Sequence, residues 1–402
     1  MDHGTEVLLG LFAIFVAAQI GAEAAQRLKL PAVVGEIAAG CLLGSSFLGW
    51  VKVTAPFELL ADLGAVFLLF SVGLETRLED LKKVGRVSAL VGVAGVVLPF
   101  LLGAGWATLN HYDTPKAAFV GAAFVATSAG ITARVLQDLG VLNRIESRVI
   151  LGAAVIDDIL AMLLLGVVTA LQGGEGINLS SLLAVLLQAI GFVALIVVVG
   201  TRVMRQSSPL LEAPINPHSP LTISLAVCLG LAAAASYLGL AAIIGAFLAG
   251  MVAAETRQRH TLEKQLQPIT AFLVPFFFVV TGAKVNLGDL GSASALSSLL
   301  VITLLAIAGK VLGCGGGAAS LGRKSALIVG VGMVPRGEVG IIVASLGHRA
   351  GVFSGTMYTL IIAMSLLTSV IGPPALSALL AHKSRDPSPL RTEGPGDGKS
   401  PP

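Results

Sequence analysis

Long apolar segments recur along almost the whole chain, and they constrain its fold more than any other feature. Each is close to the roughly 20 residues that one bilayer crossing needs. Thirteen such segments cover residues 5–25, 31–49, 57–75, 87–109, 116–137, 147–171, 179–202, 220–236, 239–255, 266–284, 295–319, 324–347 and 354–381. Only 12% of the residues are charged, whereas soluble domains carry about 25%. The sequence therefore predicts an all-α polytopic membrane protein with thirteen transmembrane helices and excludes a soluble enzyme.

Lys and Arg are unevenly distributed among the loops. Most follow odd-numbered segments, and the loops after even-numbered segments hold only Lys52, Lys116 and Arg349. Because cytoplasmic loops carry an excess of basic residues, we expect the N-terminus outside and the C-terminus in the cytoplasm. An odd number of crossings agrees with this orientation. We expect a multi-pass protein of the cell inner (plasma) membrane, with a disordered cytoplasmic tail over 382–402, which is rich in Pro, Gly and charge.

Three sets of residues recur at a nearly constant distance along the chain. They pair 31–40 (PAVVGEIAAG) with 241–250 (AAIIGAFLAG), 72–81 (VGLETRLEDL) with 281–290 (TGAKVNLGDL), and Gly130 and Gly140 with Gly337 and Gly347, at offsets of 210, 209 and 207 residues. This offset spans seven predicted helices, an odd number, so the second copy must be inverted in the membrane. Inverted repeats are typical of secondary transporters, although a channel could share the same ancestry.

Two adjacent carboxylates, Asp157 and Asp158, lie near the centre of the apolar segment 147–171. A charged side chain at this depth costs roughly 3 kcal/mol or more, and neighbouring like charges repel. We therefore interpret the pair as a functional site rather than as helix-capping or packing residues. The equivalent helix of the second repeat carries Ser365 and Thr368 but no carboxylate, so the chain has one such pair.

Two segments carry small, polar and helix-breaking residues in mid-membrane, at 126–134 (ATSAGITAR) and 333–340 (MVPRGEVG). Pro335 lacks a backbone donor, and glycines loosen a helix. Breaks at equivalent places of two halves point to a binding site near the midplane, where half-helix ends present partial charges. Arg336 and Glu338 are candidates to neutralise these ends. The alternative is a proline kink with a local ion pair.

Lys310 lies in the middle of the segment 295–319 and needs an acidic partner there. Asp157 and Asp158 are the candidates, and one lysine facing two aspartates leaves one net carboxylate. That charge suits a small monovalent cation or a proton. The alternative is that Lys310 extends to the membrane surface. There is no phosphate-binding loop of the G-x-x-x-x-G-K-[ST] type and no nucleophile–base pair, so we expect neither an ATP-driven pump nor an enzyme.

Five stretches carry a family resemblance: 66–76 (VFLLFSVGLET), 126–139 (ATSAGITARVLQDL), 152–159 (GAAVIDDI), 309–313 (GKVLG) and 331–346. They resemble the monovalent cation:proton antiporter-2 family, in particular its NapA-type bacterial sodium/proton antiporters, over nearly the whole chain. The resemblance implies an NhaA/NapA-like fold with inverted repeats and two crossed broken helices. It also implies a homodimer and sodium (lithium)/proton exchange by elevator movement of a core domain. The exchange is expected to be electrogenic, because Asp-Asp members move about two protons per sodium ion whereas Asn-Asp members are electroneutral. Kef-type relatives carry Gln-Asp instead, so we do not expect glutathione-gated potassium efflux.

The resemblance and the repeat together divide the chain. The predicted parts are a dimerisation domain in two halves (1–85, helices 1–3, and 207–291, helices 8–10), a core ion-transport domain in two halves (86–173, helices 4–6, and 292–381, helices 11–13), a linker helix 7 (174–206), and the tail 382–402.

The resemblance also assigns the site. Asp158 is implied as the main ion- and proton-binding carboxylate, Asp157 as the partner that releases Lys310 when sodium enters, and Thr127 and Ser128 as neighbours. The residues of the two breaks are Gly130, Thr132, Pro335, Arg336, Gly337 and Glu338. We expect transient sodium binding at Asp157 and Asp158, no cofactor, and as partners sodium or lithium ions, protons, the lipid bilayer and a second copy of the chain, but no nucleic acid.

Three other functions remain open from the sequence. A potassium/proton antiporter differs only in ion geometry, and a cation channel on the same scaffold would conduct without a proton gradient. An organic-anion symporter of the bile-acid type also has broken, crossed helices, although the Asp-Asp pair beside a lysine favours a small cation. A purely structural role would leave the buried charges without a purpose.

Overall fold

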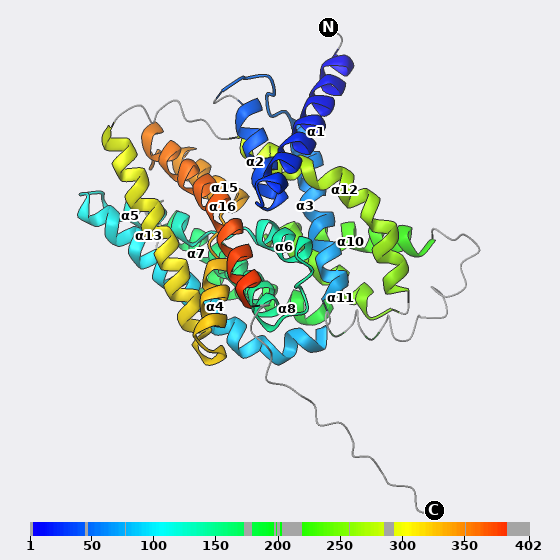
Figure 1. Ribbon diagram of the computed structural model, residues 1–402. Helices are drawn as coiled ribbons and strands as arrows, with labels where there is room; N and C mark the ends of the chain where they lie inside the picture. The colour runs from blue at the N-terminus through cyan, green and yellow to red at the C-terminus, as the bar shows by residue number, and fades with distance from the viewer. Residues whose placement is uncertain are drawn as a thin grey trace, which may run out of the picture.

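The computed structural model describes residues 3–44, 47–76, 78–172, 179–196, 198, 202, 219–256, 258–284, 293–349 and 351–383. These residues form helices joined by short turns, with no strand among them (Figure 1). The helices are α1 (His3–Arg27), α2 (Ala32–Leu43), α3 (Ala55–Glu75), α4 (Leu78–Leu109), α5 (Thr114–Val125), α6 (Ala129–Asp138), α7 (Ile145–Gln172), α8 (Leu179–Leu195), α10 (Ser219–Tyr237), α11 (Ala242–Ala254), α12 (Arg259–Ala283), α13 (Ala293–Gly317), the short η3 (Ala319–Leu321), α14 (Arg323–Gly332), α15 (Glu338–Arg349) and α16 (Gly355–Lys383).

Each predicted apolar segment coincides with one helix or with an interrupted pair, but some ends differ. α12 begins at Arg259, before the predicted start at 266. Its first turns are polar, so hydropathy does not mark them, but an ion pair between Arg259 and Glu263 one turn later supports the helix. α2 ends at Leu43 although the prediction ran to 49, because the apolar character continues beyond the helix to the exposed Trp50.

Nine helices or interrupted pairs in the described part of the chain are long and apolar enough to cross a membrane. They are α1, α3, α4, the α5–α6 pair, α7, α10, α12, α13 and α16. α2, α8 and α11 are apolar but shorter. The all-helical fold is thus present, and the count of thirteen crossings stays a prediction. From residue 384 onward, the predicted tail lies outside the described residues.

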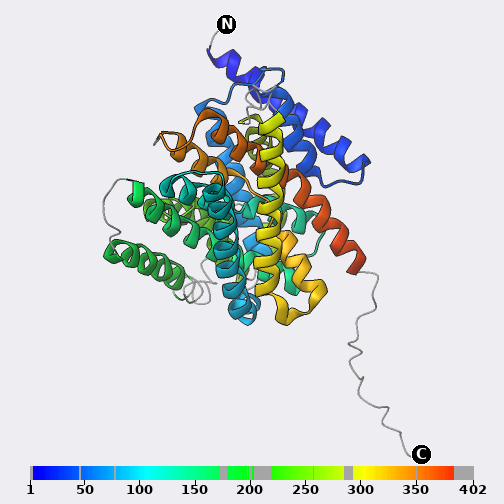
Figure 2. The same ribbon diagram turned by 90° about the vertical axis from the view of Figure 1, so that its left-hand side faces the viewer.

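The helices pack in two groups, which lie on opposite sides of the view in Figure 1. In the group we call the scaffold group, α1 packs on α2, α2 and α3 pack on α12, and α3 and α10 pack on α11. In the core group, α4 packs on α5, α7 and α13, and α16 packs on α13, α14 and α15. Figure 2 shows α4 and α13 running side by side. The groups meet mainly where α6 packs against α2 and α3 and where α16 packs against α2; we call this contact the seam.

Glycine pairs bring the scaffold helices into backbone contact, and two of these contacts are related by the sequence repeat. A Cβ added to Gly282 would lie 3.1 Å from the Cα of Gly40, and one added to Gly250 would lie 2.8 Å from the Cα of Gly73. Small residues allow such close approach between apolar helices. The first contact joins α2 to α12 and the second joins α11 to α3. Gly40 and Gly250 are 210 residues apart, and Gly73 and Gly282 are 209 apart, so the offset of the sequence repeat relates the two contacts.

Candidate functional site

Two helices of the core group are interrupted, and their interruptions touch. The chain leaves helical geometry between Val125 and Ala129, and again between Gly332 and Glu338. The backbone N–H of Ser128 donates a hydrogen bond to the carbonyl oxygen of Pro335 at 2.8 Å. The two breaks therefore cross and bond to each other, as the paired helix-breaking residues predict.

Arg336 binds the carbonyl end of the half-helix α5. Its guanidinium is fully buried and donates to the carbonyl oxygens of Phe124 at 2.6 Å and Ala306 at 3.1 Å. The last carbonyls of a helix carry partial negative charge and lack partners within the helix. An arginine here satisfies them and joins α5 to α13. The backbone carbonyl of Arg336 in turn accepts a hydrogen bond from Ser369 on α16.

The carbonyl end of α14 is bound in the reciprocal way. The hydroxyl of Thr132, on α6, donates to the carbonyl oxygen of Gly332 at 2.7 Å. Gly337 lies against Ser128, since a Cβ there would meet the Ser128 hydroxyl oxygen at 2.7 Å. The carbonyl ends of the half-helices α5 and α14 are thus each held by a side chain from the other interrupted helix. The side chain of Glu338, the first residue of α15, lies outside the described part, so its predicted role at a helix end has no structural account.

Thr127 and Gly130 lie on either side of Ser128. The Thr127 side chain is buried, and its hydroxyl donates to the carbonyl of Val125 at 3.4 Å. Gly130 is in the first turn of α6 and faces Phe277 of the scaffold group, where a Cβ would lie 3.1 Å from the ring. The first residues of α6 therefore bring the site close to the seam.

Lys310 and Asp157 form an ion pair inside the core group. The Nζ of Lys310 lies 2.8 Å from Oδ1 of Asp157, and neither side chain is exposed at all. The other oxygen of Asp157, Oδ2, is buried and has no hydrogen-bond partner in the described part of the chain. Lys310 therefore does not extend to a membrane surface, and Asp157 keeps one oxygen available as an acceptor.

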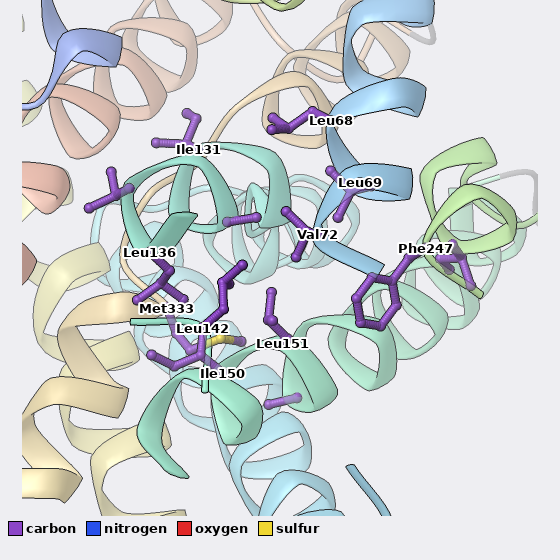
Figure 3. Close-up of a cluster of buried hydrophobic side chains, with 14 of the residues drawn as sticks. Leu68, Leu69, Val72, Ile131, Leu136, Leu142, Ile150, Leu151, Phe247 and Met333 are labelled. Atoms are coloured by element: carbon purple, nitrogen blue, oxygen red, sulfur yellow. The ribbon is translucent and has the colours of Figure 1, made fainter. Parts of the chain in front are cut away.

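Asp158 faces the seam instead. Its residue exposure is 5%, and it contributes to a small pocket with Leu69 of α3, Leu151 of α7 and Phe247 of α11. The rest of the pocket lining is apolar. Figure 3 shows Leu69, Leu151 and Phe247 in the cluster of buried side chains that joins the two helix groups. Consecutive helix residues point about 100° apart, so one aspartate binds Lys310 while the next faces the boundary between the groups.

Gly95 on α4 lies beside the ion pair and leaves room for the sulfur of Cys314, and the sequence carries no signal of this role. A Cβ at Gly95 would lie 3.7 Å from the Nζ of Lys310 and 3.8 Å from Oδ1 of Asp157. It would lie only 2.5 Å from the sulfur of Cys314. Gly95 is one of 48 glycines in the chain, so only its neighbours distinguish it.

This geometry predicts that a substitution at Cys314 restores the stability that is lost when a side chain is added at Gly95. Gly95→Ala should destabilise the protein by about 1–3 kcal/mol, the usual range for overpacking a tight core. Cys314→Ala removes the one atom that clashes, so the double variant Gly95→Ala/Cys314→Ala should regain most of that loss. Melting temperatures of the wild type, both single variants and the double variant in detergent test this. A double variant less stable than Gly95→Ala would contradict it.

Known proteins of similar sequence match nearly the whole chain. Residues 11–382 match the family model described as "Sodium/hydrogen exchanger, transmembrane". The high-affinity Na⁺/H⁺ antiporter NhaS3 of Synechocystis sp. is 35% identical over 95% of this chain and 92% of its own length. The Na⁺/H⁺-K⁺ antiporter GerN of Bacillus cereus is 34% identical over 92% of this chain and 96% of its own length. An Na⁺/H⁺ antiporter of Enterococcus hirae is 31% identical over 90% of this chain and 94% of its own length.

Among solved structures, the sodium proton antiporter MjNhaP1 from Methanocaldococcus jannaschii at pH 8 has a similar fold. The superposition has a TM-score of 0.67, with 17% sequence identity, and covers 94% of this chain and 99% of that one.

Proposed function

The chain belongs to the sodium/hydrogen exchanger family, and on that premise we propose that it is a sodium/proton antiporter. The observation that carries the proposal is the buried Asp157–Asp158 pair, in which Asp157 binds Lys310. Asp158 lines one pocket with Ala129, the residue at which the helix resumes after the first break. Carboxylate oxygens and free backbone carbonyls are suitable ligands for a small hard cation. Carboxylates also bind protons, so one site serves both ions. The scheme needs no bound cofactor.

Competition for the same carboxylates couples the two flows. We propose that Asp158 binds sodium first, because it faces the pocket at the seam. Asp157 then contributes an oxygen ligand to the sodium ion and releases Lys310. In this structure the two side chains form an ion pair at 2.8 Å. When protons occupy the carboxylates instead, sodium is excluded because its negatively charged ligands are lost. Thr127 and the carbonyls of the breaks are proposed as further oxygen ligands.

The two helix groups suggest how the site is exposed first to one side of the membrane and then to the other. We propose that the core group moves as an elevator against a dimerisation domain made of α1–α3 and α10–α12. The four buried ionisable side chains of the candidate site, Asp157, Asp158, Lys310 and Arg336, belong to the core group and would travel together. The apolar lining of the pocket at Asp158 can slide, because no directional bond has to be broken there. A second copy of the chain, joined through the dimerisation domain, would hold it still in the membrane.

The membrane arrangement is also a proposal. We infer thirteen crossings built from inverted repeats, with the N-terminus outside, the C-terminus in the cytoplasm and the protein in the plasma (inner) membrane. The related glycine contacts Gly40–Gly282 and Gly73–Gly250 support a twofold relation between the repeats. The basic loops support the orientation.

We propose that the exchange is electrogenic, and a charge count at the site shows what this requires. The two aspartates, Lys310 and Arg336 have formal charges that sum to −2 + 2 = 0. One bound sodium ion gives +1, whereas two bound protons give +2. If two protons replace each sodium ion, the moving core carries different charges in the two directions, and the membrane potential drives the cycle.

Exchange in proteoliposomes tests the function. With a pH-sensitive dye inside, addition of sodium or lithium outside should move protons, and a clamped membrane potential should change the rate. Potassium is a second candidate, because the relative GerN is called an Na⁺/H⁺-K⁺ antiporter; potassium is therefore added in a parallel assay. Folded protein that moves no protons with any of the three ions would contradict the proposal, and cation flux independent of the proton gradient would indicate a channel.

The same assay carries a prediction about pH. Because a proton and a sodium ion compete for one set of carboxylates, the sodium concentration for half-maximal exchange should rise as pH falls. The maximal rate at saturating sodium should change much less. Sodium titrations at several symmetric pH values, with the same pH on both sides, measure the two quantities separately. A half-maximal concentration that is independent of pH would show that the two ions use separate sites.

A further inference from the structure

Another buried carboxylate, Glu36, lies at the seam and has no part in the scheme above. It is in α2 of the scaffold group and is only 3% exposed. Its Oε2 is buried and has no hydrogen-bond partner among the described residues. Glu36 is far from Asp157 and Asp158 in sequence and belongs to the other helix group. A buried polar atom without a partner is rare in folded proteins and calls for an explanation.

The charged neighbours of Glu36 come from α6. α2 packs against α1, α6, α12 and α16, and the charged groups near Glu36 are Arg134 and Asp138 on α6. The Nε of Arg134 lies 3.1 Å from Asp138, one turn along its own helix. Glu23 and Arg27 of α1 pair with each other on the exposed surface. In the described residues, α12 and α16 add no charged group near Glu36.

Two carboxylates therefore lie near one arginine, and Arg134 is bonded to Asp138 and not to Glu36. Among the described residues, Glu36 is left buried without an ion-pair partner across the seam. A carboxylate in such a place takes up a proton rather than remain charged, because an isolated buried charge is far more costly than a neutral group. If α6 moves relative to α2, water or Arg134 can reach Glu36, and the charged form becomes favourable.

We propose that Glu36 is a second proton-binding site, protonated while α6 packs against α2 as in this structure and ionised when that contact opens. The packed arrangement then holds one proton more than the open one. By linkage, acid pH favours the packed seam and alkaline pH favours the open seam. The proton binds to one helix group and its release depends on the other. Glu36 would therefore make the relative movement of the groups depend on pH without contacting the transported cation.

Infrared difference spectroscopy tests the proton itself. Spectra of the purified protein at acid and alkaline pH should contain a protonated-carboxyl band that is lost in Glu36→Gln. The matched control is Glu23→Gln, which makes the same chemical change at an exposed, ion-paired carboxylate. Loss of the band in Glu36→Gln alone is the expected result. Spectra of Glu36→Gln that match the wild type would overturn the proposal. This readout does not depend on transport, so it stands or fails separately from the proposed exchange activity.

The pH profile of exchange tests the consequence. Glutamine resembles the protonated side chain, so Glu36→Gln should hold the seam packed at every pH. We expect wild-type exchange at acid pH and a several-fold loss of rate at alkaline pH, with Glu23→Gln unchanged throughout. Melting temperatures show that each variant is folded. A wild-type pH profile in folded Glu36→Gln would exclude coupling of this proton to movement.

Discussion

Replacing Asp158 with asparagine should abolish sodium-dependent proton movement and leave the protein folded. Asparagine keeps the shape of the side chain, but it cannot balance the charge of a sodium ion or take up a proton at neutral pH. Asp158 lines an apolar pocket at 5% exposure, and Lys310 is bonded to Asp157 instead. The substitution therefore leaves no buried lysine without a partner, and stability should be at or above that of the wild type.

The measurement is the rate of proton movement in the proteoliposome dye assay. Empty liposomes give the baseline rate, and Asp113→Asn is the control variant. Asp113 precedes α5 and is 59% exposed, so the same change there should leave exchange unaffected. Asp158→Asn should fall to the rate of empty liposomes with sodium and with lithium. Wild-type exchange by a folded Asp158→Asn variant would show that Asp158 is not the ion-binding carboxylate.

The largest loss of stability should come from Lys310→Met. Methionine keeps most of the volume of lysine, so the main effect is to leave Asp157 buried without its cation. Breaking a buried ion pair at one partner costs about 3–5 kcal/mol. By contrast, Lys116→Met removes a lysine that is 40% exposed and 3.5 Å from Asp113, where the loss should be about 0–1 kcal/mol.

A double variant separates the charge effect from packing. Asp157→Asn/Lys310→Met removes both charges, so its melting temperature should return most of the way toward the wild type. Thermal unfolding of the three variants in one detergent measures this. Equal melting temperatures for Lys310→Met and the wild type would mean that the pair does not stabilise the fold, and a double variant as unstable as Lys310→Met would assign the loss to packing.

Much of the fold is readable from the sequence because a bilayer leaves few choices. Its interior offers no water to unpaired backbone groups, so long apolar segments must be helices. For the same reason the clusters around Thr127 and Pro335 predict breaks, and both breaks are present in the structure. The ends of α2 and α12 were less predictable, because hydropathy reports the surroundings of a residue and not the hydrogen bonds that begin or end a helix.

The candidate site, like the fold, was predictable from the sequence only in part. The cost of charge in a membrane identifies Asp157, Asp158 and Lys310 without any structure. The residues alone, without the family resemblance, did not decide which aspartate binds the lysine. They also did not reveal the space that Gly95 leaves, the carbonyl oxygens that Arg336 binds, or the unpartnered carboxylate of Glu36.

The sequence by itself thus determined which segments are helices, where two of them break, and that two carboxylates and a lysine are buried together. Only the tertiary structure decided which way each of these side chains points. The physical reason is that periodicity shows which residues share one face of a helix, whereas the rotation of that helix toward its neighbours depends on packing along its whole length. A rotation of about 100° would exchange the positions of Asp157 and Asp158, and that rotation is set by contacts of α7 with helices distant in the sequence.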